Sequence, residues 1–231
     1  AGPMKLAVKT PILLCAATRW EVAPLVKRWA LHEENPSRFT GSVGGVDVVL
    51  LKTGIGASGV REALAAEAAP RLIVSAGFAG ALQPEMACAD LVLEAQGLDS
   101  EVPQAAREIA AKQKTPLHFG RIADTDRMLY DPKDKIALGK VERCSAVDME
   151  SAALRASAAR LGCPFLAARV ILDEVSERLV AEIPPGESLQ DMLAFALRNA
   201  RELPLMMRLG LRQARAIKRL AAFLEQLLPR L

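Results

Sequence analysis

Three acidic residues that follow apolar segments are the side chains in this sequence best placed to do chemistry. They are Glu21, Glu150, which Met149 precedes, and Asp173. A carboxyl group can donate or accept a proton once its surroundings set its pKa, so we expect acid–base chemistry where the three come together. Each acid alone has a structural explanation, because an acid between a strand and a helix often caps the helix or faces its positive end. Only the joint arrangement favours a functional role.

Two glycine-rich segments lie between these acids and are predicted to be turns that approach a ligand. The first is Gly54-Ile55-Gly56 and the second is Ser75-Ala76-Gly77-Phe78-Ala79-Gly80. Glycine allows a close backbone approach and a positive φ, so such turns can cradle a sugar or a phosphate. One turn of this kind is more often only a tight connection. The two segments are therefore candidate binding residues in combination with the acids.

Other reactive side chains are few and scattered. The two histidines, His32 and His118, are isolated, which argues against a zinc site and against a histidine-centred catalytic triad. The four cysteines are far apart and form no CxxC pair, a pattern typical of reduced thiols in a cytoplasmic protein. We expect no metal and no organic cofactor.

The apolar runs predict an α/β fold that would place the acids along one edge of a sheet. Strands are expected at Ile12–Ala17, in two pieces within Gly41–Lys52, and at Leu72–Ala76, Leu91–Ala95 and Phe165–Leu172. Helices are expected at Trp20–Leu31, Ala57–Ala69, Pro103–Lys112, Met149–Leu161, Ser188–Arg201 and Pro204–Leu228. This alternation predicts a mixed, mostly parallel central sheet flanked by helices, a three-layer sandwich. Ligands of such sheets bind at the carboxyl ends of the strands.

Length and charge indicate one α/β domain with a basic end. A chain of 231 residues suits a single core, and we assign residues 4–202 to the domain and 203–231 to a C-terminal helix appended to it. That end carries six basic residues against one acid, Glu225, and so holds more positive charge than the net +3 of the whole chain. The body of the protein is slightly acidic, which predicts that it does not bind nucleic acid.

Four segments together give the sequence a family resemblance. They are Leu51–Gly56, Ile73–Gly80, Ala146–Glu150 and Arg169–Val175. In order and spacing they resemble the nucleoside phosphorylase and nucleosidase superfamily, and most of all the methylthioadenosine/S-adenosylhomocysteine nucleosidases, over the stretch from about residue 12 to residue 175. The resemblance implies the phosphorylase/hydrolase-like fold, cleavage of the N-glycosidic bond of a purine nucleoside, and a homo-oligomer.

The resemblance also implies a role for each candidate residue. Asp173 would protonate, or hydrogen-bond to a proton on, a nitrogen in the five-membered ring of the purine, Glu150 would accept the ribose hydroxyls, and Glu21 would activate the attacking water. Met149 would pack its thioether against the ribose. Backbone groups near Met128-Leu129 would contact the base.

Three positions favour water over phosphate as the nucleophile. In the phosphorylase branch, an arginine and a serine flank the second glycine segment and another arginine follows the first strand. We match these positions to Ser75, Phe78 and Glu21, which hold a phosphate dianion poorly. Arg19 is close enough in sequence to keep phosphorolysis as an alternative.

The expected substrate is a 5′-modified adenosine with a large 5′ group. Phe78 replaces a small hydroxyl residue of the methylthioadenosine nucleosidases, and the segment between Ala95 and Pro116 is short, which implies an open pocket. Neighbouring branches are the futalosine hydrolases and the hopanoid-associated phosphorylases, so removal of adenine from adenosylhopane is an alternative reaction. A protein that binds a nucleoside or a lipid without turnover is an alternative of another class.

The sequence is compatible with three different surroundings of the basic C-terminal helix. Its apolar face, with Ile217, Leu220 and Leu224, could lie on an anionic membrane surface, which would place a cytoplasmic enzyme at the inner face of the membrane. It could equally close the fold with its basic face in water, or pack at a subunit interface.

Overall fold

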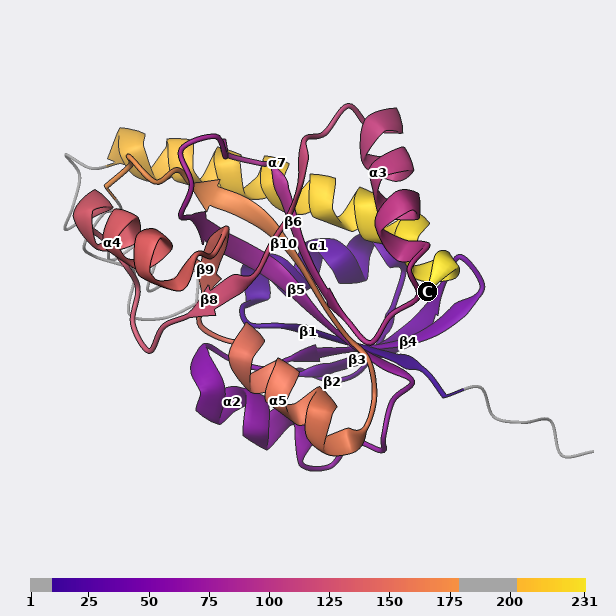
Figure 1. The fold of residues 1–231 in the computed structure, drawn as a ribbon. Helices are drawn as coiled ribbons and strands as arrows, with labels where there is room; N and C mark the ends of the chain where they lie inside the picture. Colours follow the sequence, from indigo (N-terminus) through magenta and orange to yellow (C-terminus); the bar gives the residue numbers. More distant parts are fainter. Residues whose placement is uncertain (1–9, 179–202) are drawn as a thin grey trace, which may run out of the picture.

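The computed structural model of the protein describes residues 10–178 and 203–231, and in them a ten-stranded sheet lies between two layers of helices (Figure 1). The strands are β1 (Ile12–Ala16), β2 (His32–Asn35), β3 (Arg38–Val43), β4 (Val46–Lys52), β5 (Leu72–Ala81), β6 (Leu91–Gln96), β7 (Leu117–Phe119), β8 (Ile122–Asp124), β9 (Ala146–Asp148) and β10 (Phe165–Asp173). The helices are α1 (Arg19–Trp29), α2 (Gly56–Leu64), α3 (Val102–Lys112), α4 (Pro132–Glu142), α5 (Ser151–Leu161) and α7 (Leu203–Leu227), and the short 3₁₀ helix η2 (Leu228–Arg230) follows α7.

Parallel strands form the centre of the sheet, in the order β4-β1-β5-β10. Strands β3 and β2 continue it antiparallel on one side, while β6 joins β10 antiparallel and carries β7 on the other. The far end of β5 also pairs with β9, which pairs with β8. The predicted mixed α/β sheet is confirmed. Because the central strands are parallel, their carboxyl ends meet at one edge.

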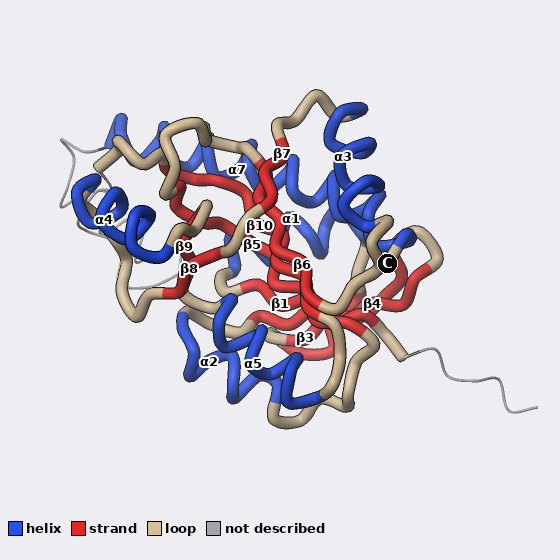
Figure 2. The backbone as a smooth tube through the Cα atoms, viewed as in Figure 1, coloured by secondary structure: helices blue, strands red, loops and turns tan. Residues whose placement is uncertain are grey.

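The two faces of the sheet are covered by different helices (Figure 2). Successive residues of a strand point to opposite faces, so Leu14 and Val74 belong to the core under α1, α3 and α7, whereas Leu13 and Ile73 pack with α2 and α5. Helix α4 lies beside the short strands β8 and β9 (Figure 1).

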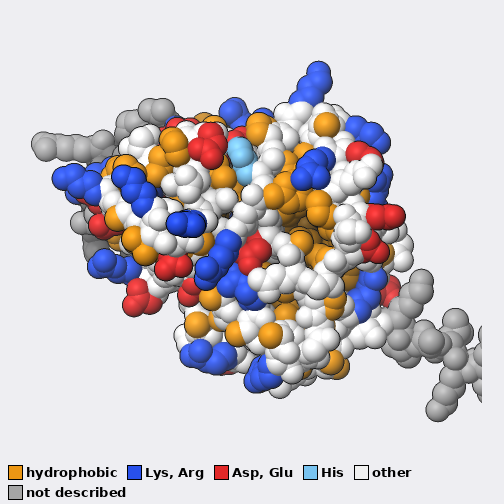
Figure 3. Space-filling model, viewed as in Figure 1, with side chains coloured by type: hydrophobic (Ala, Val, Ile, Leu, Met, Phe, Trp, Pro, Cys, Tyr) orange, Lys and Arg blue, Asp and Glu red, His pale blue; other side chains and the backbone are white. Residues whose placement is uncertain are grey.

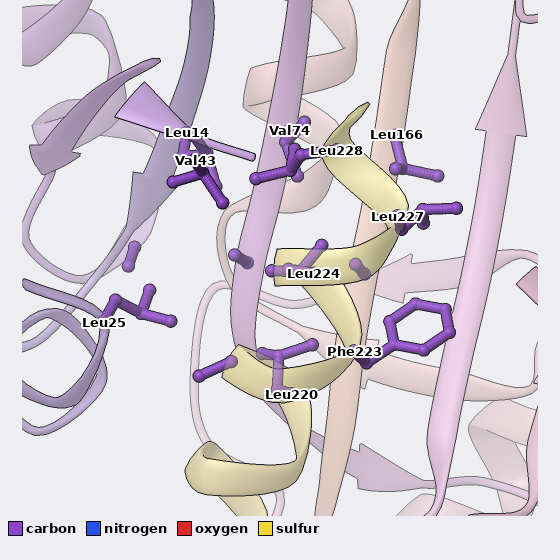
Figure 4. Close-up of a cluster of buried hydrophobic side chains, with 14 of the residues drawn as sticks. Leu14, Leu25, Val43, Val74, Leu166, Leu220, Phe223, Leu224, Leu227 and Leu228 are labelled. Carbon is purple, nitrogen blue, oxygen red and sulfur yellow. The ribbon is translucent and has the colours of Figure 1, made fainter. Parts of the chain in front are cut away.

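Helix α7 closes one of these layers. Figure 4 shows Leu220, Phe223 and Leu224 of α7 against the sheet residues Leu14 and Val74, and all five side chains are fully buried. Burying one such side chain contributes about 1.5–3 kcal/mol. The apolar face considered for a membrane contact is thus packed into the protein's own core, with the basic residues exposed on the opposite side: Arg215 and Lys218. No helix among residues 10–178 and 203–231 is long and apolar enough to cross a bilayer.

Charges of both signs are interspersed on the face of the molecule seen in Figure 3. All four cysteines are unpaired thiols, as their spacing predicts. Among the described residues, no group of three or more histidine, cysteine or acidic side chains could hold a metal ion.

The second glycine segment is not a turn, and this prediction is wrong. Strand β5 runs on through it to Ala81 because both sides of the strand find partners there: Gly77 lies opposite Arg169 of β10, and Gly80 lies opposite Val147 of β9. Glycine is used here for close packing within the sheet rather than for bending the chain.

Several other boundaries also differ from the sequence-based expectation. Helix α2 ends at Leu64 instead of Ala69, and α5 begins at Ser151 instead of Met149. Helix propensity does not show where an alanine-rich helix stops. Strands β2, β7, β8 and β9 and helix α4 were not predicted. The helix predicted at 188–201 lies outside the described residues.

Candidate active site

The three predicted acids are buried at the carboxyl ends of the central strands. Glu21 is 3% exposed at the start of α1, Glu150 is 6% exposed just before α5, and Asp173 is 6% exposed as the last residue of β10. A buried acid needs hydrogen bonds or an opposite charge. The partners of each acid therefore show how the site is built.

Glu21 connects the start of α1 to the second glycine segment. Its Oε2 accepts hydrogen bonds from the backbone N–H of Ala17 (3.0 Å) and of Thr18 (2.8 Å), and from the Thr18 hydroxyl (3.0 Å). Its Oε1 accepts from the backbone N–H of Phe78 at 2.8 Å. Glu21 is thus part of a capping box, and its second oxygen is also directed across the sheet. The structural explanation of Glu21 as a helix cap is therefore confirmed, and its role towards a substrate stays a prediction.

Gly77 is required by this close approach. A Cβ atom added at Gly77 would lie 2.1 Å from Oε1 of Glu21 and 2.7 Å from Nη1 of Arg169. Any side chain would therefore push the carboxylate and the guanidinium out of place.

Arg169 lies at the centre of the acids and is 1% exposed. Its Nε lies 2.7 Å from Oδ2 of Asp148, and its Nη2 lies 3.7 Å from Oε2 of Glu150. It also donates hydrogen bonds to the Ser75 hydroxyl (2.5 Å) and to the carbonyl oxygen of Phe78 (3.3 Å). Burial opposes the charge, but the surrounding carboxylates raise the pKa of Arg169, so the guanidinium stays positive. We call Glu21, Asp148, Glu150 and Arg169 the arginine cluster.

The side chain of Asp148, and not that of Glu150, caps helix α5. Its Oδ1 accepts from the backbone N–H of Glu150 (3.2 Å) and of Ser151 (2.9 Å), and its Oδ2 accepts from the Ser151 hydroxyl. Glu150 makes no side-chain cap; its Oε1 instead accepts from the backbone N–H of Gly56 at 2.8 Å. Burial raises the pKa of Glu150, and Arg169 partly offsets this. The explanation of Glu150 as a helix cap is therefore wrong.

Asp173 lies at a register shift in the pairing of β10 with β5, between Ile171 and Asp173. Such an irregularity can re-aim a side chain, and it sets Asp173 opposite Gly80, where an added Cβ would lie 3.2 Å from Oδ2. Burial raises the pKa of Asp173, although an ion pair with the buried Lys135 of α4 acts against the rise. We call Asp173 and Lys135 the lysine pair.

Three further predicted residues are half-buried. Met149 is half-buried between Asp148 and Glu150, and Met128 and Leu129 are half-buried between β8 and α4. Leu129 packs on a small cluster that includes Val147 of β9.

Two large apolar side chains are exposed close to the acids. Ile55, in the first glycine segment, is 60% exposed, and Trp20, the neighbour of Glu21, is 43% exposed.

Sequence reasoning did not identify Lys135, Asp148 or Arg169 as members of the site. Asp148 and Arg169 lie in the segments Ala146–Glu150 and Arg169–Val175, which carry the family resemblance. Their positions near Glu150 and Asp173 in the chain could therefore have indicated that they belong to the site. Lys135 offered none, since its helix carries four other charged residues: Lys133, Asp134, Lys140 and Glu142.

Comparison with known proteins identifies relatives of the whole described fold. The family model described as the phosphorylase superfamily matches residues 11–102 and 94–206. A 5′-methylthioadenosine/S-adenosylhomocysteine nucleosidase of Geobacillus kaustophilus is 28% identical over 205 residues, which cover 76% of this chain and 85% of that protein.

Two solved structures share the fold. The nucleosidase of the same name from Campylobacter jejuni has a TM-score of 0.69 at 17% identity, with 96% of this chain and 100% of that chain covered. The futalosine hydrolase of Helicobacter pylori has a TM-score of 0.69 at 19% identity, with coverages of 96% and 99%.

Proposed function

Because the chain belongs to the phosphorylase superfamily, we propose that it cleaves the N-glycosidic bond of a purine nucleoside with water and releases the free base. The observation that carries this proposal is the pair of differently held acids at one edge of the sheet. Asp173 has a raised pKa, as a proton donor needs. Glu21 is held by four donated hydrogen bonds, as a fixed acceptor needs.

Asp173 acts on the base. Its carboxyl group donates a proton to a nitrogen in the five-membered ring of the purine while the bond from the ribose anomeric carbon to the base breaks. The base then leaves as a neutral molecule, and the ribosyl group becomes oxocarbenium-like. General acid catalysis of this kind contributes about 10²–10⁴-fold.

Glu150 and the arginine cluster hold the sugar. The Glu150 carboxylate accepts hydrogen bonds from the ribose hydroxyls, and its negative charge lies near the developing cation. Arg169 fixes the orientation of Glu150 through their ion pair. Met149 packs against the ribose, and backbone groups around Met128 contact the base.

Glu21 accepts a proton from the attacking water, whose oxygen bonds to the anomeric carbon. The charges around this position favour water over phosphate. Three carboxylates, those of Glu21, Asp148 and Glu150, surround the single guanidinium of Arg169, so a phosphate dianion would be repelled by more charge than attracts it.

Exposed apolar side chains beside the acids support a 5′-modified adenosine with an apolar 5′ group. Trp20 precedes Glu21 in the chain and Ile55 precedes Gly56, which binds Glu150, and both side chains are exposed. Apolar groups of a ligand bind where they remove such surface from water. Adenosylhopane, cleaved with phosphate as in the hopanoid-associated phosphorylases, is the alternative this observation favours. A membrane contact through α7 would rest on its exposed residues: Leu211, Arg215 and Lys218. A homo-oligomer and a cytoplasmic location stay predictions.

The test is to incubate the protein with methylthioadenosine, S-adenosylhomocysteine, 5′-deoxyadenosine, adenosine, inosine and adenosylhopane, with and without phosphate, and to quantify free base. Base release without phosphate supports the proposal and ranks the 5′ groups. Release only with phosphate would support the phosphorylase alternative. No release from any of them would favour a nucleoside- or lipid-binding protein without turnover.

A further inference from the structure

Lys135 is a fully buried lysine that none of the proposed steps uses. Its side chain is 1% exposed, and its Nζ forms an ion pair with Oδ2 of Asp173. A lysine is rarely buried without a partner, and a buried charge destabilises the fold unless it is paired. The contact between this lysine and the proposed proton donor therefore needs an explanation.

The geometry fixes the ammonium group in one position. Besides Oδ2 of Asp173, Nζ donates hydrogen bonds to the carbonyl oxygens of Glu174 (3.1 Å) and Glu177 (2.8 Å). An ammonium group has three protons, so each proton has an acceptor. Lys135 thus connects α4 to the segment that leaves β10.

The pair occupies only one of the two oxygens of Asp173. Within the described residues, no other side chain binds Oδ1. The carboxyl group therefore has Oδ2 facing the ammonium, while Oδ1 has no side-chain partner among the described residues.

Other charged groups near the pair are directed elsewhere. The Glu177 carboxylate accepts a hydrogen bond from Arg212 of α7 at 2.6 Å and one from the backbone N–H of Glu174 at 3.1 Å. The Glu174 carboxylate accepts from the backbone N–H of Cys88 at 3.3 Å. Among the described residues, Lys135 is accordingly the cation that contacts Asp173.

We propose that Lys135 is a positioning residue that holds Oδ2 of Asp173, leaves Oδ1 to face the purine, and sets by its charge the pH range in which that carboxyl group is protonated. The assignment of Asp173 as the proton donor rests on the proposed function; the coupling between the two side chains does not. In this arrangement the lysine makes Asp173 a stronger acid than burial alone would leave it, because an opposite charge favours the ionised form.

Thermal unfolding of Lys135→Met, Asp173→Asn and the double variant tests the coupling without any substrate. We expect Lys135→Met to lower the melting temperature more at pH 8 than at pH 5, because the unpaired carboxylate can be protonated only at the lower pH. Adding Asp173→Asn should restore part of the loss at pH 8. A loss that is equal at both pH values and is not relieved in the double variant would overturn the proposal, since it would show a packing role alone.

The pH dependence of base release tests the consequence for catalysis. The alkaline limb of kcat/KM reports loss of the proton from the acid, so Lys135→Met should move this limb up by about 1–3 pH units. Lys140→Met, on the exposed side of the same helix, should leave the limb where it is. If the wild type releases base but the alkaline limb of kcat/KM does not move in Lys135→Met, this inference is refuted and the proposed function still stands. No base release by the wild type would refute the proposed function, and the unfolding experiment would then decide whether Lys135 and Asp173 are coupled.

Discussion

The arginine cluster and the lysine pair balance buried acids in two different ways. In the cluster, a guanidinium on the sheet strand β10 is shared by acids that come from α1, β9 and the start of α5. In the pair, one ammonium group delivered by α4 meets one carboxyl group. Arginine is always charged and offers several donors in a fixed plane, whereas lysine is a point charge on a flexible stem. The cluster is therefore suited to holding a sugar in place, and the pair is suited to a group whose proton must move.

Replacing Arg169 by Met has the largest expected effect, because it leaves several buried carboxylates without their cation. Breaking a buried pair costs about 3–5 kcal/mol, so the free energy of unfolding in urea should fall by at least this amount and base release should be lost. Arg28→Met is the control. Its ion pair with Glu225 is exposed, and exposed pairs contribute about 0–1 kcal/mol. Equal losses in the two variants would contradict the view that the cluster holds the fold at this edge.

Asp173→Asn should abolish proton donation while keeping the shape of the side chain. We expect kcat to fall by about 10²–10⁴-fold, with a smaller change in KM, because the amide can still contact the base. Single-turnover base release and direct binding of the nucleoside separate the two effects, and thermal unfolding shows how much protein is folded. Normal base release by this variant would remove Asp173 from the mechanism. Retained binding with no release by Asp173→Asn, alongside base release by the wild type, would exclude a protein that only binds.

The burial of a strand decides whether the sequence could predict it. The buried central strands follow continuous apolar runs, so β1, β5, β6 and β10 were found. All four residues of β2 are exposed, and such a strand has no apolar pattern to detect.

Within the site, a residue could be predicted when the feature that positions it lies close to it along the chain. The positions of Glu21, Glu150 and Asp173 follow from strands that end just before or at them. The partners of buried Lys135 lie far along the chain: Asp173, 38 residues further on, and the carbonyl oxygens of Glu174 and Glu177. A local pattern cannot show such a partner, and for that reason half of the lysine pair was missed.

Glu150→Gln removes one charge from the arginine cluster without removing its cation. Hydrogen bonds to charged groups contribute about 1.5–3 kcal/mol, so kcat/KM should fall by about 10- to 100-fold, with much of the change in KM.

Stability should also respond to pH in this variant. Burial raises the pKa of Glu150 above its ordinary value, so the folded protein holds this proton more tightly than the unfolded chain does. The resulting stabilisation is complete below the ordinary pKa and is lost as the pH rises through the raised pKa. The stability of the wild type relative to Glu150→Gln should therefore decrease as the pH rises from 4, as measured by urea unfolding. The opposite slope would show that Arg169 outweighs burial at this carboxyl group.

Arg212→Met has the smallest expected effect. It tests whether charges beyond the lysine pair act on Asp173. Arg212 of α7 binds Glu177, and both side chains are partly exposed. Although burial opposes it, this hydrogen bond lowers the pKa of Glu177. Lys135 contacts the carbonyl oxygen of Glu177 and not its carboxylate, so the loss of Arg212 reaches Asp173 only through a screened charge. We expect the free energy of unfolding to change by about 1 kcal/mol or less and the alkaline limb of base release to stay in place. A shift as large as that of Lys135→Met would mean that the proton donor is controlled by a chain of charges running out to α7, and the contrast between a shared cluster and an isolated pair would no longer hold.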